Sequence, residues 1–265
     1  MRIGKLWLIG QSCLHGKIEE VTLPVAKVDI IVSEWMGYCL LYEAMLDSVL
    51  WARDHYLAPD GLMVPSHTTL YIAPLTDPDY IADHITFWKS VYGFNMTSMT
   101  AHVYDEVLIR DLKSSILAAD SVPFLRLSLH TTKKEELVFA SKAFSMSLKE
   151  DIDELDGFVI WFDTFFMINR DLKVPEDAKA ENWGGHERKG VAFTTGPGGP
   201  ETHWRQGVLL IDHSKRPAEA LKKGQVIRGE IGYKKRSENS RELEIEVKWD
   251  VAGSGEKGKQ LWFMR

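Results

Sequence analysis

The residues of this chain with the clearest chemical potential are two glutamates, Glu34 and Glu43, which stand nine positions apart. Residues 28–32, just before them, are apolar and rich in β-branched side chains, a pattern that predicts a buried strand. Glu34 therefore stands at the carboxyl end of a strand, where open α/β sheets place their ligand crevices. After the two glutamates a helix is predicted, and its apolar face carries Leu46, Val49, Leu50 and Leu57.

Two carboxylates directed into one crevice suit general acid–base chemistry or the capture of a planar cation such as a guanidinium, whose donor fork fits a carboxylate. Gly37 allows the loop between them to turn tightly. Spacing alone favours a structural interpretation, in which Glu34 caps the following helix and Glu43 is a solvated helix residue. A glycosidase that uses the two glutamates as acid and base is a further interpretation.

Four motifs, taken in order along the chain, resemble those of the protein arginine methyltransferases. Residues 33–43 resemble the double-glutamate loop of that family, and residues 202–204, Thr-His-Trp, resemble its Thr-His-Trp loop. Residues 16–21 resemble the segment that contacts the adenine of the methyl donor, and Trp88 with residues 91–94 resembles the helical dimerisation arm. The resemblance is closest to the subclass that forms asymmetric dimethylarginine. It implies transfer of methyl groups from S-adenosyl-L-methionine to arginine side chains of proteins.

The resemblance implies a role for each residue at the centre of the site. A guanidinium with a pKa above ~12 is a poor nucleophile, because none of its nitrogens carries free lone-pair density. Glu34 and Glu43 would hold its positive charge on the two non-reacting nitrogens, and one of them would accept a proton. His203 would line the pocket and help to relay the proton. The acid that pairs with this histidine in the family would precede residue 1.

The resemblance also assigns residues to the two ligands. The substrate pocket would contain Trp204, Met36, Tyr38 and Met45. Met45 would narrow it and restrict which nitrogen of a monomethylated arginine is presented, which favours the asymmetric product. For the donor, Glu19 would accept a hydrogen bond from the adenine amino group and Ile18 would pack near the ring. From the residues alone, the histidine, tryptophan and methionines are packing residues and Glu19 is a surface acid.

The rest of a donor site is not recognisable in the sequence. A methyltransferase of this architecture holds the donor with a glycine-rich turn after the first strand and an acid at the end of the second. Residues 1–15 contain neither, since Gly4, Gly10 and Gly16 stand six positions apart. We therefore expect the C-terminal two thirds of an arginine methyltransferase, which by itself does not bind S-adenosylmethionine tightly. The alternative function is a catalytically inactive module that binds arginine or a partner protein and has lost the donor site.

The hydrophobic pattern divides the chain near residue 63. Residues 1–63 alternate strand-like and helix-like segments, which predicts the C-terminal part of a Rossmann-like methyltransferase domain; residues 59–61, Pro-Asp-Gly, are a turn signal. Strand-like segments fill residues 64–265, and alternation is clearest at 125–129 and 242–249, which predicts a β-barrel that would bind the substrate. The fold class expected is thus α/β plus β.

Residues 78–112 look helical and interrupt the strand series. Their apolar side chains include Phe87, Trp88, Val91, Tyr92 and Phe94. An insertion packed on its own barrel and a protruding arm that buries these side chains in a partner are equally good interpretations of the residues. The resemblance selects the arm and implies a homodimer.

Composition restricts the partners. A net charge of −6 and the lack of a basic run offer no surface that tracks phosphates, so nucleic acid is not expected to bind directly. Two cysteines indicate no disulfide framework and a reducing compartment. The apolar run at residues 6–9 is too short for a signal sequence or a membrane span. We expect a protein of the cytoplasm or nucleus. Its substrates, by resemblance, are Arg-Gly-rich segments or histone tails, and no metal is expected.

Overall fold

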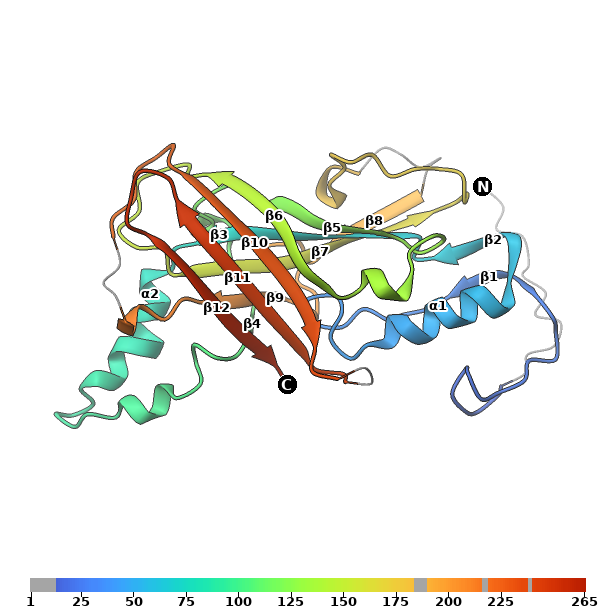
Figure 1. Cartoon of the computed structure of the whole chain (residues 1–265), viewed down its shortest axis with the longest axis horizontal. Coiled ribbons are helices and arrows are strands. Elements are labelled where there is room, and N and C mark those ends of the chain that lie inside the picture. The colour runs from blue at the N-terminus through green and yellow to red at the C-terminus, as the bar shows by residue number, and fades with distance from the viewer. Residues whose placement is uncertain (1–12, 184–189, 216–218, 238–239) are drawn as a thin grey trace.

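The computed structural model describes residues 13–183, 190–215, 219–237 and 240–265. A small α/β segment leads into a larger body of strands, from which an arm projects (Figure 1). In the described part of the chain, no helix has the length and apolar character needed to cross a membrane.

The α/β segment consists of two parallel strands and one helix. Strands β1 (Val28–Val32) and β2 (Leu57–Val64) pair in parallel, and helix α1 (Met45–Tyr56) connects them. The predicted strand and helix are confirmed. Helix α1 buries Leu46 and Leu50 against the body, while Leu57 is buried as the first residue of β2. Arg53 on α1 donates hydrogen bonds to two carbonyl oxygens of the body, those of Leu129 and Thr132.

Two expectations about this segment are wrong. Strand β1 is not buried, because Ile30 and Val32 are 56% and 75% exposed. A parallel strand is buried only where neighbouring elements cover both of its faces, and β1 pairs with β2 alone among the described strands. Residues 59–61 are not a turn but an irregular part of β2, where pairing passes from Val28–Leu57 to Ile30–Leu62. The Pro-Asp-Gly sequence is accommodated there as a bulge.

The body consists of two antiparallel sheets, in agreement with the predicted β-rich domain. The four-stranded sheet has the order β12-β11-β10-β6, with β6 (Phe139–Ser147), β10 (Val226–Lys235), β11 (Leu243–Val251) and β12 (Lys257–Met264). The six-stranded sheet has the order β4-β9-β7-β3-β5, with β8 paired to β7. Its strands are β3 (His67–Leu75), β4 (Leu108–Arg110), β5 (Val122–Ser128), β7 (Gly157–Met167), β8 (Gly190–Thr194) and β9 (Gln206–Leu210).

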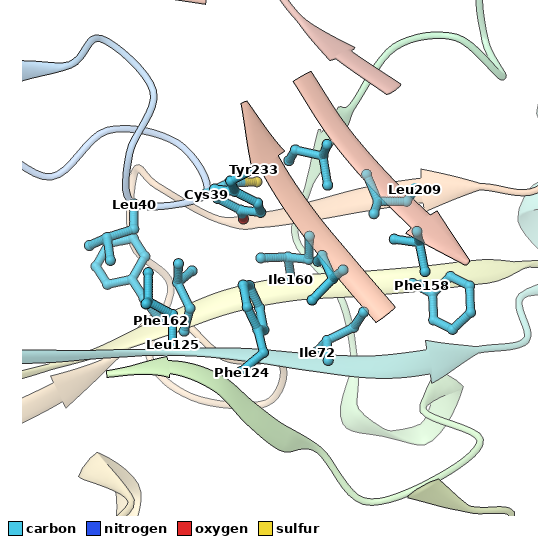
Figure 2. Close-up of a cluster of buried hydrophobic side chains, with 14 of the residues drawn as sticks. Cys39, Leu40, Ile72, Phe124, Leu125, Phe158, Ile160, Phe162, Leu209 and Tyr233 are labelled. Atoms are coloured by element: carbon cyan, nitrogen blue, oxygen red, sulfur yellow. The ribbon is translucent and has the colours of Figure 1, made fainter. Parts of the chain in front are cut away.

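The core lies between the two sheets. Alternate residues of β11 are buried, as its sequence predicts, and its outward residues are charged. The central strands β7 and β9 are buried along almost their whole length. Figure 2 shows that Cys39 and Leu40, from the loop between β1 and α1, enter this core beside Tyr233 and Phe162. The loop that carries the two glutamates is therefore packed into the body rather than laid on its surface.

The arm is built from short turns. Helix α2 (Pro78–Tyr80) is followed by a π-helical turn (Ile81–Ile85) and by 3₁₀ turns (Thr86–Lys89 and Thr97–Thr100). The helical expectation for residues 78–112 thus holds for residues 78–89 and 97–100, while the residues between and after them form turns and β4 (Leu108–Arg110). Tyr92 and Phe94 at the tip are 98% and 72% exposed. Further 3₁₀ turns span Ser114–Ile116, Lys134–Glu136, Ala180–Asn182 and His213–Lys215.

Candidate active site

The loop between β1 and α1 is tightly folded around Gly37. The backbone groups of Gly37 and Leu40 exchange two hydrogen bonds of 3.0 Å, which close a turn. A Cβ atom on Gly37 would lie 2.0 Å from the carbonyl oxygen of Tyr42, so only glycine fits this approach. The prediction that Gly37 permits a tight turn is confirmed.

Four residues of the same loop adopt left-handed backbone conformations: Cys39 (φ 47°), Leu40 (φ 69°), Glu43 (φ 75°) and Ala44 (φ 59°). Such conformations cost about 1–2 kcal/mol for each residue other than glycine, so the surroundings must impose them. Core packing offsets part of this cost, because the side chains of Cys39 and Leu40 are buried, at 4% and 1% exposed. Burial raises the pKa of the Cys39 thiol to about 12, so this thiol is a protonated packing group.

The structure excludes the structural interpretation of the two glutamates. Ala44 is the N-cap residue of α1, so Glu34 does not cap this helix. Glu43 precedes α1 in a left-handed conformation and is not a helix residue. Glu34 follows β1, is exposed, and forms no hydrogen bond or ion pair with any residue in the described ranges. Its carboxylate is therefore available to a ligand.

Glu43 is held by Arg241, which precedes β11. The backbone N–H of Glu43 donates to the carbonyl oxygen of Arg241 at 2.9 Å. Arg241 Nη2 and Glu43 Oε1 form an ion pair, also at 2.9 Å. A second ion pair joins the same two parts of the chain: Lys235 of β10 pairs with Asp47 of α1 at 2.9 Å. Sequence reasoning missed Arg241, because nothing in its local pattern distinguishes it from the many charged residues around the strands.

The Thr-His-Trp loop is tied directly to the glutamate loop. Trp204 Nε1 donates a hydrogen bond of 2.7 Å to the carbonyl oxygen of Met36. The Trp204 ring stacks on Phe193, with centroids 5.5 Å apart and planes 15° apart, and meets Phe162 edge-on at 5.7 Å. The structure thus brings together two segments that the sequence predicts to share one site.

The other residues predicted to line the substrate pocket belong to the two loops that the hydrogen bond from Trp204 to Met36 connects or, in the case of Met45, to the start of α1. His203 is exposed, with its ring centroid 3.8 Å from that of Trp204, and it has no hydrogen-bond or ion-pair partner within the part of the chain that the structure describes. The side chain of Met36 is buried in the core, and its contact with the other loop is made by its carbonyl oxygen. Tyr38 and Met45 are 38% and 45% exposed.

The predicted adenine-contacting residues lie beside α1. A hydrogen bond from Ser48 of α1 lowers the pKa of the Glu19 carboxyl below its usual range. Ile18 is half-buried, and Tyr56 at the end of α1 donates to the carbonyl oxygen of Val21 at 3.2 Å. The segment therefore runs along the helix that follows the two glutamates. Ser48 was not predicted, since its contact depends on the tertiary fold.

The chain is similar in sequence to known proteins of one family. Residues 66–254 match the family model of the arginine methyltransferase oligomerization subdomain. Ribosomal protein arginine N-methyltransferase rmt3 of Schizosaccharomyces pombe is 40% identical over 243 residues, which are 92% of this chain and 42% of that protein. Protein arginine N-methyltransferase 1 of the same yeast is 39% identical over 238 residues, 90% of this chain and 63% of that protein.

Solved structures give the same result. The Trypanosoma brucei PRMT1 enzyme-prozyme heterotetrameric complex with AdoHcy is similar with a TM-score of 0.78 and 28% identity, over 95% of this chain and 73% of that one. Arabidopsis thaliana protein arginine methyltransferase 10, in a uniquely open conformation, has a TM-score of 0.72 and 27% identity, over 95% of this chain and 74% of that one.

The fold is that of a methyltransferase in which part of a Rossmann-like domain leads into a β-barrel. The chain belongs to the protein arginine methyltransferase family. The resemblance to this family seen in the sequence is confirmed, and the glycosidase interpretation does not apply to a member of it. The chain spans 42% and 63% of the lengths of the two yeast relatives.

Proposed function

We propose that the protein to which this chain belongs transfers methyl groups from S-adenosylmethionine to arginine side chains of proteins. The observation that carries the proposal is the hydrogen bond from Trp204 to Met36, because it joins two separate family motifs into one site beside Glu34 and Glu43. The solved structure of the Trypanosoma brucei relative is a complex with AdoHcy, the demethylated form of S-adenosylmethionine, which supports the same donor here.

In this proposal the two glutamates act on the substrate guanidinium. Glu34 is exposed and without a partner among the described residues, and Glu43, nine positions further along the same loop, is half-buried. Their carboxylates would localise the positive charge on two nitrogens, so that the third keeps lone-pair density. One carboxylate would then accept the proton that leaves this nitrogen. His203, beside Trp204, would line the same pocket and help to move the proton to water.

The donor supplies an electrophilic methyl group on a sulfonium. Ile18 and Glu19 would contact its adenine: the Glu19 carboxylate is exposed and lowered in pKa, so it is an ionised acceptor for the adenine amino group. Met45, at the start of α1 and 45% exposed, would restrict the orientation of a monomethylated arginine, which favours asymmetric dimethylarginine over the symmetric isomer.

The remaining expectations extend this proposal to the whole protein. We place the boundary between the donor-binding and barrel domains at residues 63 and 64, where β2 ends. The arm of residues 78–112 would mediate a homodimer, in line with the oligomerization subdomain that the chain matches. Arg-Gly-rich segments or histone tails would be the substrates, in the cytoplasm or nucleus.

Methyl transfer tests the proposal directly. The natural full-length form is incubated with radiolabelled S-adenosylmethionine and an Arg-Gly-rich peptide, and the methylated amino acids are separated. Label in monomethyl- and asymmetric dimethylarginine is expected, and Glu34→Gln or Glu43→Gln should reduce kcat by about 100-fold or more. Glu230→Gln, which removes a carboxylate of β10 that pairs with Lys248 of β11 at 3.4 Å, is the matched control. Binding of the peptide without label transfer would favour the inactive arginine-binding module instead.

A further inference from the structure

The segment that starts α1 is attached to the barrel at both of its ends. At one end Arg241 contacts Glu43 through its backbone carbonyl oxygen and its guanidinium, each at 2.9 Å. At the other end Lys235 pairs with Asp47, and both of these side chains are largely buried, at 12% and 20% exposed. Figure 1 shows the last residues of β10 and the first residues of β11 close to the start of α1. The barrel therefore determines where this part of the glutamate loop lies.

The ion pair between the guanidinium of Arg241 and the Glu43 carboxylate is separate from the hydrogen bond between their backbones. The hydrogen bond from Glu43 N–H to the carbonyl oxygen of Arg241 is independent of the residue type at position 241. It supports the left-handed backbone of Glu43 (φ 75°) in any variant. The ion pair between Nη2 and Oε1 acts only on the Glu43 side chain, so its effect can be separated from that of the loop conformation.

We propose that Arg241 is a positioning residue for Glu43, which orients this carboxylate before a substrate arginine binds. The inference rests on the proposed function. A free glutamate side chain has several rotamers, and restricting it costs conformational entropy on binding unless a neighbour has already restricted it. Arg241 engages Oε1, which leaves the second carboxylate oxygen for a nitrogen of the substrate.

The same contact could instead make Arg241 a competitor of the substrate, since both are guanidinium groups. Two features favour positioning. The side chain of Arg241 is 68% exposed, so water screens its repulsion of a second cation. The guanidinium also engages only Oε1, so a substrate nitrogen can bind the second carboxylate oxygen of Glu43 without displacing Arg241.

A double-mutant cycle tests the proposal. Fluorescence anisotropy measures the affinity of a labelled Arg-Gly-rich peptide, and of the same peptide with citrulline in place of arginine, for the wild type, Arg241→Gln, Glu43→Gln and the double variant. Arg241→Gln should weaken arginine-peptide binding by about tenfold, and Arg241→Lys by less. In the Glu43→Gln background the same change should have no further effect, because Arg241 acts through Glu43.

Arg236→Gln is the matched control. Arg236 follows β10 at the same end of the barrel, is 67% exposed, and pairs with Glu242 at 3.4 Å. It should alter the affinity by less than about twofold, as expected for an exposed ion pair. The thermal midpoints of all variants show whether they remain folded.

The outcomes separate the two proposals. Tighter peptide binding by Arg241→Gln would make Arg241 a competitor, and an equal loss in both Glu43 backgrounds would mean that it does not act through Glu43; either result overturns the inference. An unchanged affinity with the arginine preference intact also overturns it, while the proposed arginine site stands. A wild type that does not distinguish arginine from citrulline would instead overturn the arginine site itself.

Discussion

The indole nitrogen of Trp204 donates a 2.7 Å hydrogen bond to the backbone carbonyl of Met36, across 168 positions of sequence. The acceptor lies two residues after Glu34 and immediately before Gly37, in the turn that separates the two glutamates. A backbone acceptor in this turn means that a movement of the Thr-His-Trp loop moves the glutamate loop as well. The barrel and the α/β segment are thus joined at the candidate site.

Trp204→Phe tests the contribution of this hydrogen bond. It removes the donor but keeps a ring to pack against Phe193, so stability should fall by only about 1 kcal/mol. Affinity for an arginine peptide should fall by about fivefold to tenfold, because the glutamate loop loses its link to the barrel. Trp51→Phe, at a half-buried position of α1 where the ring stacks on His55, is the control and should leave the affinity unchanged. Wild-type affinity of Trp204→Phe would show that packing alone maintains the site.

Gly37→Ala should disrupt the glutamate loop. The added Cβ would lie 2.0 Å from the carbonyl oxygen of Tyr42, so the turn between Gly37 and Leu40 must open. We expect a loss of about 3 kcal/mol in the free energy of unfolding by urea, with loss of arginine-peptide binding. Gly224→Ala is the control: its φ is +85° but a Cβ there meets nothing within 4 Å, so about 1 kcal/mol is expected. Equal losses for the two variants would contradict the role given to the close approach.

Stability should fall as the pH is lowered, through His130. Its Nε2 accepts a hydrogen bond from the backbone N–H of Met63 in β2 at 3.0 Å. Burial, followed by the charges of Arg170, His67 and Arg53, lowers the pKa of His130 to about 4. The folded state therefore resists protonation that the unfolded chain accepts below about pH 6.5. The stabilisation is complete above about pH 6.5 and is lost as the pH falls towards 4.

A His130→Gln variant isolates this effect, because glutamine offers an acceptor and does not titrate. Between pH 7 and pH 4.5 the wild type should lose about 1–2 kcal/mol more of its unfolding free energy than the variant, a range that allows for solvent screening of a half-buried group. Urea unfolding at each pH provides the measurement. Parallel pH profiles for the two proteins would show that His130 contributes nothing to the pH dependence.

The arm should mediate self-association in the full-length form. Tyr92 and Phe94 expose large apolar areas at its tip, which monomeric proteins usually avoid. The double variant Tyr92→Ala/Phe94→Ala should shift the full-length protein from dimer to monomer in light scattering. Ile168→Ala, which removes an apolar side chain that is 59% exposed elsewhere, should leave the dimer intact. A stable dimer that survives the double variant would place the interface elsewhere.

Local sequence patterns predicted those elements whose burial follows a simple period. Strand β11 and helix α1 were predicted because each has a buried face that its apolar residues mark. Strand β1 has the same apolar composition, but it is exposed, because burial depends on neighbours that composition does not describe. Residues 59–61 carry the composition of a turn, yet pairing with β1 holds them in a strand.

The candidate site shows the same limit. Spacing and family motifs located Glu34, Glu43 and Trp204 in the sequence. Neither spacing nor motif predicts that Arg241 contacts Glu43 or that Ser48 contacts Glu19, because these pairs form only when distant segments pack together. The left-handed residues of the glutamate loop were equally unpredictable, since their conformations are imposed by the core and not by their own preferences.

The central claim is that Glu34 and Glu43 form a binding site for a guanidinium. The most direct test compares the affinities of an arginine peptide and its citrulline counterpart, which is similar in shape but uncharged, for the wild type and for the Glu34→Gln/Glu43→Gln double variant. We predict that the wild type prefers the arginine peptide by about 30-fold or more, as charged hydrogen bonds warrant, and that the preference falls below about threefold in the double variant. A preference that is equally large in both proteins would contradict the claim, because the charge would then be recognised elsewhere.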